Sequence, residues 1–219
     1  MSYSSVKLVA ITKPVIEGID TAEDFVAYAA RVSNPTNQFN LETSSKLLKY
    51  LIKHKHWSPF EMVQIVMEIN TTRDIARQIL RHRSFSFQEF SQRYSTVDSL
   101  GFINREARLQ DSKNRQNSIN VVDRELTKEW YEQQTNVLLA IKKAYAWALS
   151  NGIAKEQARA VLPEGLTMSK MYMAGSLRSW LHYISVRMDP STQKEHREVA
   201  EKVFTIIKEQ FPSITDDIF

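Results

Sequence analysis

One short polar segment, residues 81–95, holds side chains whose types and spacing suit the binding of an anion. It has the sequence Arg-His-Arg-Ser-Phe-Ser-Phe-Gln-Glu-Phe-Ser-Gln-Arg-Tyr-Ser, so Ser91 follows the Arg-His-Arg triplet after seven residues. Arginine binds phosphate through a fixed fork of donors that are always charged. Aromatic rings beside guanidinium groups also suit a flat heteroaromatic ligand. A nucleotide is the simplest ligand that has both parts.

Two other interpretations account for the same segment. A cluster of arginines such as Arg81, Arg83 and Arg93 is often only a solvated surface loop. Basic and aromatic residues together also suit single-stranded nucleic acid, so a nucleic-acid-binding protein is the main rival. Because the polar residues follow neither helical nor strand periodicity, we expect a helix end that passes into a ligand-presenting loop.

The segment resembles the signature of the flavin-dependent thymidylate synthases, which is Arg-His-Arg, seven residues, and Ser, continued here as Gln-Arg-Tyr-Ser. Further stretches fit the same family in the same order, from about residue 25 to 190. They are residues 30–33, 54–61, 76–78, 156–159, 162–163 and 177–180, followed by Arg187. An ordered set of this kind is far more specific than a single motif.

The resemblance implies an enzyme of nucleotide biosynthesis, a methyltransferase that converts dUMP into dTMP. It implies FAD as the hydride carrier, with methylenetetrahydrofolate as the carbon donor and NADPH as the reductant. It also implies a homotetramer whose active sites draw on more than one subunit. A non-catalytic flavin- or nucleotide-binding protein is the second rival.

Carried over residue by residue, the resemblance implies a set of contacts to each ligand. The expected flavin contacts are Ser33, His56, Ser58, Arg81, His82, Arg83, Glu89, Ser176, Arg178 and His182. The expected nucleotide contacts are Gln78, Arg81, Glu89, Ser91, Gln92, Arg93, Arg159 and Arg187. Arg187 is the expected catalytic residue, because a cation held there would favour the anionic form of the uracil imide. The family often has an asparagine where this chain has Ser176 or His182, so these positions depart from its pattern.

Several of these residues also have ordinary structural interpretations. Ser33 follows a predicted helix, where capping or turn formation is its simplest role. Gln78 is either a solvent-side residue of a helix or a reader of a uracil edge, since its amide both donates and accepts. His54 and His56 could both bind a metal ion, but a transition-metal site needs a third protein ligand and none is evident nearby. We therefore expect no metal.

Ser91 could be assigned the role of a nucleophile. A hydroxyl is a weak nucleophile at neutral pH unless a positioned base removes its proton. His82 is the only histidine near it in sequence; Arg81 and Arg83 disfavour protonation of His82 but do not orient it toward Ser91. We therefore expect Ser91 to bind the nucleotide by a hydrogen bond.

The composition limits both the architecture and the chemistry. The chain has 219 residues, 42% of them hydrophobic, and no Pro/Gly/Ser-rich linker, so we expect a single domain over residues 1–219. It has no cysteine, which excludes disulfides, thiolate metal sites and a cysteine nucleophile. Pyrimidine methylation here must therefore differ from that of the thymidylate synthases that attack uracil with a cysteine.

Charge and hydropathy favour a soluble protein with small anionic ligands. The net charge is +4, but acidic residues lie between the basic ones and no long Lys/Arg run is present, so we expect no nucleic-acid partner. The first residues lack the basic segment and apolar run of a secretion signal. The longest purely apolar stretch, residues 137–141, is too short to cross a bilayer. We expect an intracellular, cytoplasmic protein with no membrane partner.

Hydrophobic periodicity predicts the elements that must position these residues. We expect strands at about residues 5–12, 61–70 and 166–174, and helices at about residues 21–31, 43–52, 71–82, 122–151, 154–161, 176–187 and 192–210. Residues 107–120 are predicted to be a surface loop, and the acidic tail after Pro212 to be structural or disordered. With the resemblance, this pattern predicts an α/β protein of the α+β type, a mainly antiparallel sheet covered by helices.

The helix predicted at residues 176–187 carries two arginines with different orientations. Arg178 and His182 are four residues apart and share one face. Arg187 follows Arg178 by nine residues and points roughly 180° away if the helix persists. Two arginines that face apart cannot both line one small pocket on this helix. The spacing therefore indicates two ligand sites or a pocket completed by another subunit.

Overall fold

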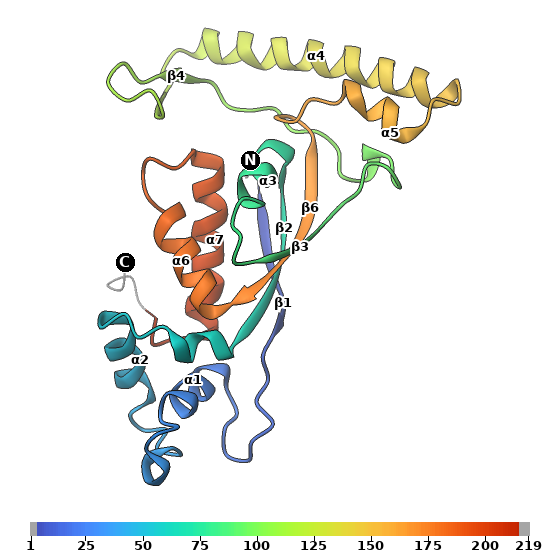
Figure 1. Ribbon diagram of the computed structural model, residues 1–219. Coiled ribbons are helices and arrows are strands. Elements are labelled where there is room, and N and C mark those ends of the chain that lie inside the picture. Colours follow the sequence, from blue (N-terminus) through green and yellow to red (C-terminus); the bar gives the residue numbers. More distant parts are fainter. Residues whose placement is uncertain (1–3, 215–219) are drawn as a thin grey trace.

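The computed structural model describes residues 4–214, and its centre is a four-stranded antiparallel sheet (Figure 1). The strand order is β1-β2-β6-β3, so β3 pairs with β6 and not with β2, which precedes it in the chain. The strands are β1 (Ser5–Ile11), β2 (Gln64–Thr72), β3 (Ser86–Glu89) and β6 (Met168–Ser176). The expected antiparallel α+β fold is confirmed.

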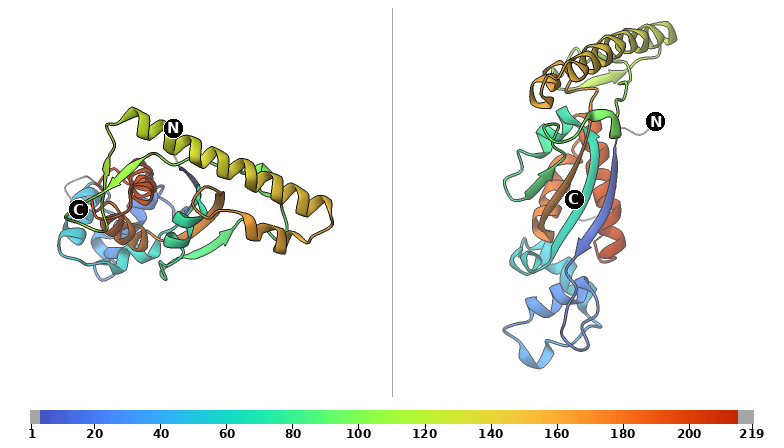
Figure 2. Two further views of the ribbon diagram at one scale, coloured as in Figure 1. Left: turned by 90° about the horizontal axis from the view of Figure 1, so that it is seen from above. Right: turned by 90° about the vertical axis from the view of Figure 1, so that its right-hand side faces the viewer.

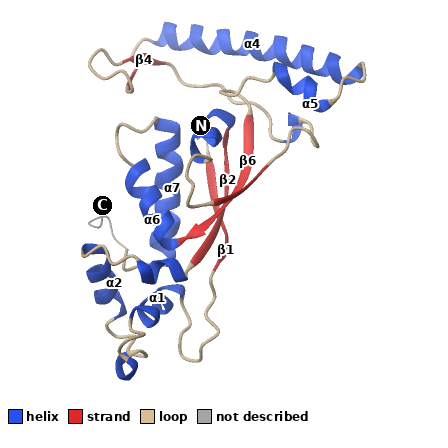
Figure 3. Cartoon of the chain, in the orientation of Figure 1, coloured by secondary structure: helices blue, strands red, loops and turns tan. Residues whose placement is uncertain are grey.

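Helices cover one face of this sheet and continue beyond both of its ends (Figure 2). Two helices pack on the sheet: α6 (Leu177–Arg187) and α7 (Lys194–Gln210). At one end of the molecule lie α1 (Ala22–Ala30) and α2 (Ser44–Lys53), and at the other lie α3 (Arg73–Ile79), α4 (Arg124–Ser150) and α5 (Lys155–Ala158) (Figure 3). None of the described helices is long and apolar enough to span a membrane.

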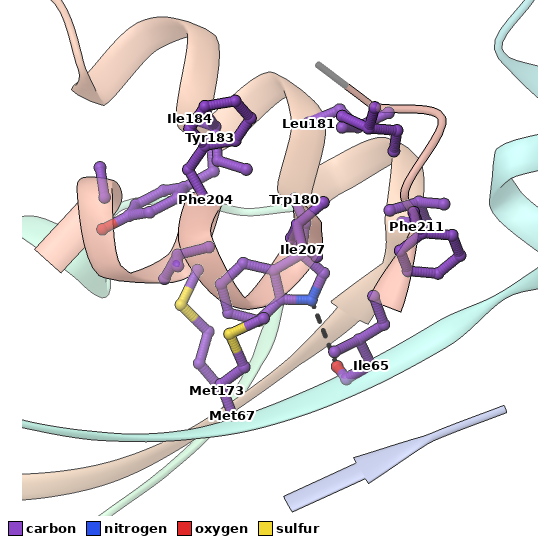
Figure 4. Close-up of a cluster of buried hydrophobic side chains, with 14 of the residues drawn as sticks. Ile65, Met67, Met173, Trp180, Leu181, Tyr183, Ile184, Phe204, Ile207 and Phe211 are labelled. Carbon is purple, nitrogen blue, oxygen red and sulfur yellow. Dashed lines mark hydrogen bonds between the residues drawn. The ribbon is translucent and has the colours of Figure 1, made fainter. Parts of the chain in front are cut away.

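The main core lies between the sheet and the helices α6 and α7. Alternate residues of the central strands, including Met67 on β2 and Met173 on β6, point toward the helices and are fully buried. Trp180 of α6 fills the space between them, and its indole N–H donates to the carbonyl of Ile65 at 3.3 Å (Figure 4). A buried indole needs such a partner, because an unpaired N–H in an apolar core is costly.

Most of the predicted elements are present. Two of them, β2 and α3, have bounds that differ from the prediction. The predicted strand at 61–70 begins at Gln64, because Pro59 opens a 3₁₀ helix, η2 (Ser58–Met62), in front of it. The predicted helix at 71–82 is shorter, since Thr71 and Thr72 still pair with β6.

Two segments predicted as loops contain strands. Residues 81–95 include β3, in which Phe87 is half-buried between the exposed Ser86 and Gln88. This alternation is short, yet it adds an edge strand to the sheet. Residues 107–120 form a hairpin of β4 (Arg108–Gln110) and β5 (Ser118–Asn120). Asp111 closes its loop by accepting the backbone N–H groups of Lys113 and Asn114. The acidic residues of the C-terminal tail lie outside the described residues.

Candidate active site

The Arg-His-Arg triplet is presented by the turn that connects α3 to β3. Phe85, which follows it, is 9% exposed and packs edge-to-face on Trp180 with ring centroids 4.8 Å apart. Its ring also lies directly over Gly175 of β6, where a Cβ atom would come within 2.5 Å of it. Arg81 and Arg83 are exposed, and no described residue forms an ion pair or side-chain hydrogen bond with either. Phe85 therefore fixes the turn, and both arginines are available to a ligand.

His82, between these arginines, is turned inward and holds Arg187. Arg187 Nε donates to His82 Nε2 at 2.9 Å, and the His82 ring lies edge-on to Tyr183 at 5.0 Å. Burial, followed by the charges of Arg187 and His182, lowers the pKa of His82 to about 4. From the sequence, we expected Arg81 and Arg83 to disfavour protonation of His82. The structure gives other causes, but the outcome, a neutral imidazole, is the same. The remaining N–H groups of Arg187 are not used by His82.

Arg178 lies on the opposite side of α6 and pairs with the 3₁₀ helix before β2. Its Nη1 is 2.6 Å from Glu61 Oε1, and both side chains are partly exposed. The hydrogen bond from Arg178 is the main cause that lowers the pKa of Glu61, and one from Ser176 adds to it. Arg178 and Arg187 thus contact different parts of the chain, as their spacing predicts.

The two positions that depart from the family pattern differ in accessibility. Ser176 is 6% exposed; its hydroxyl caps α6 by accepting the N–H of Ser179, and it donates to Glu61. The structure thus gives Ser176 a capping role, and its flavin contact stays a prediction. His182 is exposed on the same helix face as Arg178.

Glu89, at the end of β3, is a carboxylate surrounded by donors. Ser169 of β6 donates to Glu89 Oε1 at 2.8 Å, and Arg73 Nη1 lies 3.5 Å from the same oxygen. Arg77 Nη1 lies 3.8 Å from Oε2. Glu89 therefore has a structural role of its own, because it links β3 to β6 and to α3.

The turn after β3 places two predicted nucleotide contacts beside α5. Arg93 forms an ion pair with Glu156 at 3.5 Å, and Arg159 donates to the backbone carbonyl of the same glutamate at 3.3 Å. Ser91 Oγ accepts the backbone N–H of Arg93 at 3.3 Å. Gln92, between them, is only 4% exposed, and its contact with a nucleotide stays a prediction.

Three predicted flavin contacts lie at the other end of the molecule, near α1 and α2. Ser33 is in the turn after α1 and lines an open hollow of about 470 Å³ together with Arg31 and Tyr50. His56 and Ser58 are exposed at the start of η2. Among the side chains that the structure describes, no three His, Cys, Asp or Glu residues are grouped so that they could hold a metal ion.

Gln78 is engaged by α7, a connection that the sequence did not predict. Its Nε2 donates to Gln193 Oε1 at 2.7 Å, and its Oε1 lies 3.2 Å from His196 Nδ1. His196 is fully buried and its other ring nitrogen lies 3.1 Å from the hydroxyl of Tyr183. His196 was missed in the sequence analysis. Its burial could have been inferred from its position, because it falls on the same apolar stripe of the helix as Val199 and Val203.

Comparison with known proteins identifies the family. A family model described as thymidylate synthase complementing protein matches residues 14–213. The chain is 50% identical over 210 residues to the probable flavin-dependent thymidylate synthase of Paramecium bursaria Chlorella virus 1, and 96% of each chain is covered. The chain belongs to the flavin-dependent thymidylate synthase family. The flavin-dependent thymidylate synthase of Synechocystis sp. is 51% identical over 213 residues, which cover 95% of this chain and 96% of that one.

A solved structure shares the fold. The crystal structure of a UMP/dUMP methylase, PolB, from Streptomyces cacaoi bound with 5-Br dUMP superimposes with a TM-score of 0.82. It is 25% identical and the match covers 97% of this chain and 93% of that one. Family membership and the enzyme class predicted from the signature segment are thus confirmed.

Proposed function

We propose that this flavin-dependent thymidylate synthase converts dUMP into dTMP, with methylenetetrahydrofolate as carbon donor, FAD as hydride carrier and NADPH as reductant. The observation that carries the proposal is the pair of Arg187 and His82, an oriented cation beside the exposed arginines of the signature turn. Such a preorganised cation stabilises negative charge that develops on a bound ring.

The residues around the signature turn fit a flavin dinucleotide. Arg81 and Arg83 are exposed cations without a partner among the described residues, which suits a diphosphate. The exposed His182 and Arg178 could contact the flavin from α6. The residues proposed to hold FAD are those implied by the family pattern: Ser33, His56, Ser58, Arg81, His82, Arg83, Glu89, Ser176, Arg178 and His182. FAD, when bound, supplies the hydride for reduction of the transferred carbon.

The nucleotide is proposed to bind between the turn after β3 and the end of α3. Arg93 and Arg159, which converge on Glu156, would bind the phosphate, with Ser91 as an additional donor. Gln78 would read the uracil edge, and Arg187 would hold the ring imide as an anion. We include Arg81, Glu89 and Gln92 in the nucleotide site because of the family pattern.

Assembly of four subunits is part of the proposal. The predicted ligand contacts of one chain lie at both ends of the molecule, since Ser33 is near α1 and Arg159 follows α5 (Figure 1). The helix α4 carries Trp130, Leu139 and Trp147 in exposed positions. Aromatic side chains are enriched at the centres of protein interfaces, so we take α4 as the proposed subunit contact. We propose a cytoplasmic homotetramer in which neighbouring chains complete each site.

A reconstitution assay tests this function. Purified protein is incubated with dUMP, methylenetetrahydrofolate and NADPH, and dTMP is measured by chromatography, with each component omitted in turn. We expect flavin absorbance in the protein and dTMP only in the complete mixture. A colourless protein that binds no FAD, or a flavoprotein that forms no dTMP from the complete mixture, would contradict the proposal.

A further inference from the structure

A chain of hydrogen bonds runs from the buried carboxylate of Glu195 to the buried ring of Tyr183 and passes through Gln78. Gln193 Nε2 donates to Glu195 Oε2 at 2.9 Å, and Gln78 Nε2 is 2.7 Å from Gln193 Oε1. Gln78 Oε1 is 3.2 Å from His196 Nδ1, and His196 Nε2 is 3.1 Å from the Tyr183 hydroxyl. The chain thus links α7, α3 and α6.

The direction of this chain is fixed at the Glu195 end. Glu195 is 1% exposed and receives hydrogen bonds from the guanidinium groups of Arg105 and Arg108. Burial alone would raise the pKa of Glu195, but the hydrogen bond from Arg108 and the charge of Arg105 help to lower it to about 2. An ionised carboxylate only accepts hydrogen bonds, so Gln193 must donate to it through its amide nitrogen.

Each following link is then determined. Because the nitrogen of Gln193 faces Glu195, its oxygen faces Gln78 and must receive the Gln78 N–H. The oxygen of Gln78 therefore faces His196 and must receive the proton on Nδ1. Burial, followed by the charges of Arg187 and His82, lowers the pKa of His196 to about 3, so the ring carries one proton. His196 Nε2 is then an acceptor for the Tyr183 hydroxyl.

We infer that Glu195, Gln193 and His196 are positioning residues that hold the Gln78 amide in one orientation, and that this orientation selects uracil over cytosine in the nucleotide. The inference rests on the proposed function for the identity of the ligand. Gln193 uses one N–H of the Gln78 amide and His196 uses one lone pair of its oxygen. The second N–H and the second lone pair remain for a ligand. A flip of the amide would exchange the positions of this donor and this acceptor.

The two pyrimidines differ in the feature that this amide can read. The uracil edge carries a donor at N3 and an acceptor at O4, and the cytosine edge carries an acceptor at N3 and a donor at N4. An amide free to flip could satisfy either edge, whereas a fixed amide satisfies one and leaves unpaired groups against the other. Locking Gln78 therefore converts a permissive contact into a selective one.

The tautomer of His196 gives a test that needs no substrate. In protein with ¹⁵N-labelled histidine, we expect the His196 resonances of a ring protonated at Nδ1 only, assigned by their loss in His196→Asn. Gln193→Met removes the exposed Gln193 side chain from the chain of bonds, so His196 should then populate both tautomers. Tyr183→Phe is the matched control, since it removes the far end and should preserve the Nδ1–H form. An Nε2–H tautomer in the wild type, an unchanged tautomer in Gln193→Met, or a switch in Tyr183→Phe would each overturn the inference.

The specificity is tested by calorimetric titration of the flavin-loaded protein with dUMP and dCMP. We expect Gln193→Met to reduce the preference for dUMP over dCMP by about ten-fold, the effect of one misplaced hydrogen bond, and Tyr183→Phe to preserve it within about two-fold. FAD content should be unchanged in both variants. A preference in Gln193→Met equal to that of the wild type would contradict the selective role. Wild-type protein that binds no dUMP would contradict the proposed function, and the tautomer result would be unaffected.

Discussion

At the scale of single residues, the hydrogen bond between Arg187 and His82 defines the state of both side chains. Because Arg187 Nε donates to His82 Nε2, the imidazole carries its proton on Nδ1 and is neutral. The lowered pKa of His82, about 4, keeps it neutral at physiological pH. The bond fixes the guanidinium plane through Nε, a nitrogen for which lysine has no equivalent.

Substitution Arg187→Lys tests the importance of this orientation. Lysine keeps the charge but loses the donor to His82 and the planar fork. We expect kcat/KM for dUMP to fall by about 100- to 1000-fold, the effect of losing one preorganised donor, with unchanged FAD content. Arg197→Lys, at a partly exposed ion pair on α7, is the matched control and should behave as wild type. Near-normal turnover in Arg187→Lys would show that charge alone suffices.

Ser91 is expected to bind the nucleotide and not to attack it. Its hydroxyl accepts the backbone N–H of Arg93, and none of the described histidines forms a hydrogen bond with it. We predict that Ser91→Ala weakens dUMP binding by about 1–3 kcal/mol, as measured by titration, and still forms dTMP. Ser95→Ala, an exposed serine of the same turn, should change neither. If Ser91→Ala bound FAD and dUMP normally but formed no dTMP, the nucleophilic role would be restored.

The sequence predicted which residues carry charge in the site but not what holds them. Arg187 could be singled out from the family pattern, whereas its partner could not, because the bond to His82 joins residues 105 positions apart. Gln78 was recognised as a possible reader of uracil. The fixed orientation of its amide depends on Gln193 and His196. These two residues become neighbours of Gln78 only when α7 packs beside α3.

At the scale of elements, the contact between the signature turn and β6 is unusually close. Gly175 has no side chain, and the Phe85 ring occupies the space where a Cβ atom would be, 2.5 Å from the nearest ring carbon. Phe85 also contacts Trp180, so its ring is held from two sides. The glycine therefore allows the Phe85 ring, which anchors the arginine turn, to lie directly on β6.

Gly175→Ala should disturb this contact. The added methyl group must displace a confined aromatic ring, which costs about 1–3 kcal/mol in a packed core. We expect the free energy of unfolding, measured by urea denaturation, to fall by this amount, together with weaker FAD binding, since Arg83 is close to Phe85. The control is Gly165→Ala, where no atom lies within 4 Å of the added Cβ, and stability should change little. Equal stability of the two variants would contradict the role given to Gly175.

Strands in the loop-like segments were missed for a physical reason. β3 has four residues and β4 has three, so neither has enough alternation to stand out from an irregular segment. β3 depends on its pairing with β6. The long helices were predictable, because α4 and α7 repeat their apolar positions over many turns.

At the scale of the whole molecule, buried histidine makes stability depend on pH. His196 is fully buried with a pKa of about 3, whereas an unfolded histidine has a pKa of about 6.5. Between these values the unfolded state binds more protons, so the free energy of unfolding falls as pH falls, by up to about 1.4 kcal/mol per pH unit. Denaturation between pH 7.5 and 5.0 should show this slope, and His196→Asn should reduce it. Parallel pH profiles for the two proteins would contradict the assignment.

The long helix α4 makes the proposed assembly testable. Only Gln134, Tyr145 and Ala148 of its described side chains are buried, and Leu139 and Trp147 are each 62% exposed. Light scattering should give four times the 25.4 kDa mass of one chain. Trp147→Glu should lower the mass, because a charge would be buried at an apolar contact. Val15→Glu, at an exposed apolar residue away from α4, should not. A wild-type monomer would contradict the assembly.

The strand order β1-β2-β6-β3 also has a consequence for the synthesis of the chain. The signature strand β3 leaves the ribosome soon after β2, but its pairing partner β6 begins only at Met168. At about 5–20 residues per second, roughly 4–16 s of translation separate the two strands. During this interval the nascent chain exposes Phe85 and the free edge of β2. The signature turn is therefore among the last parts of this protein to acquire its shape.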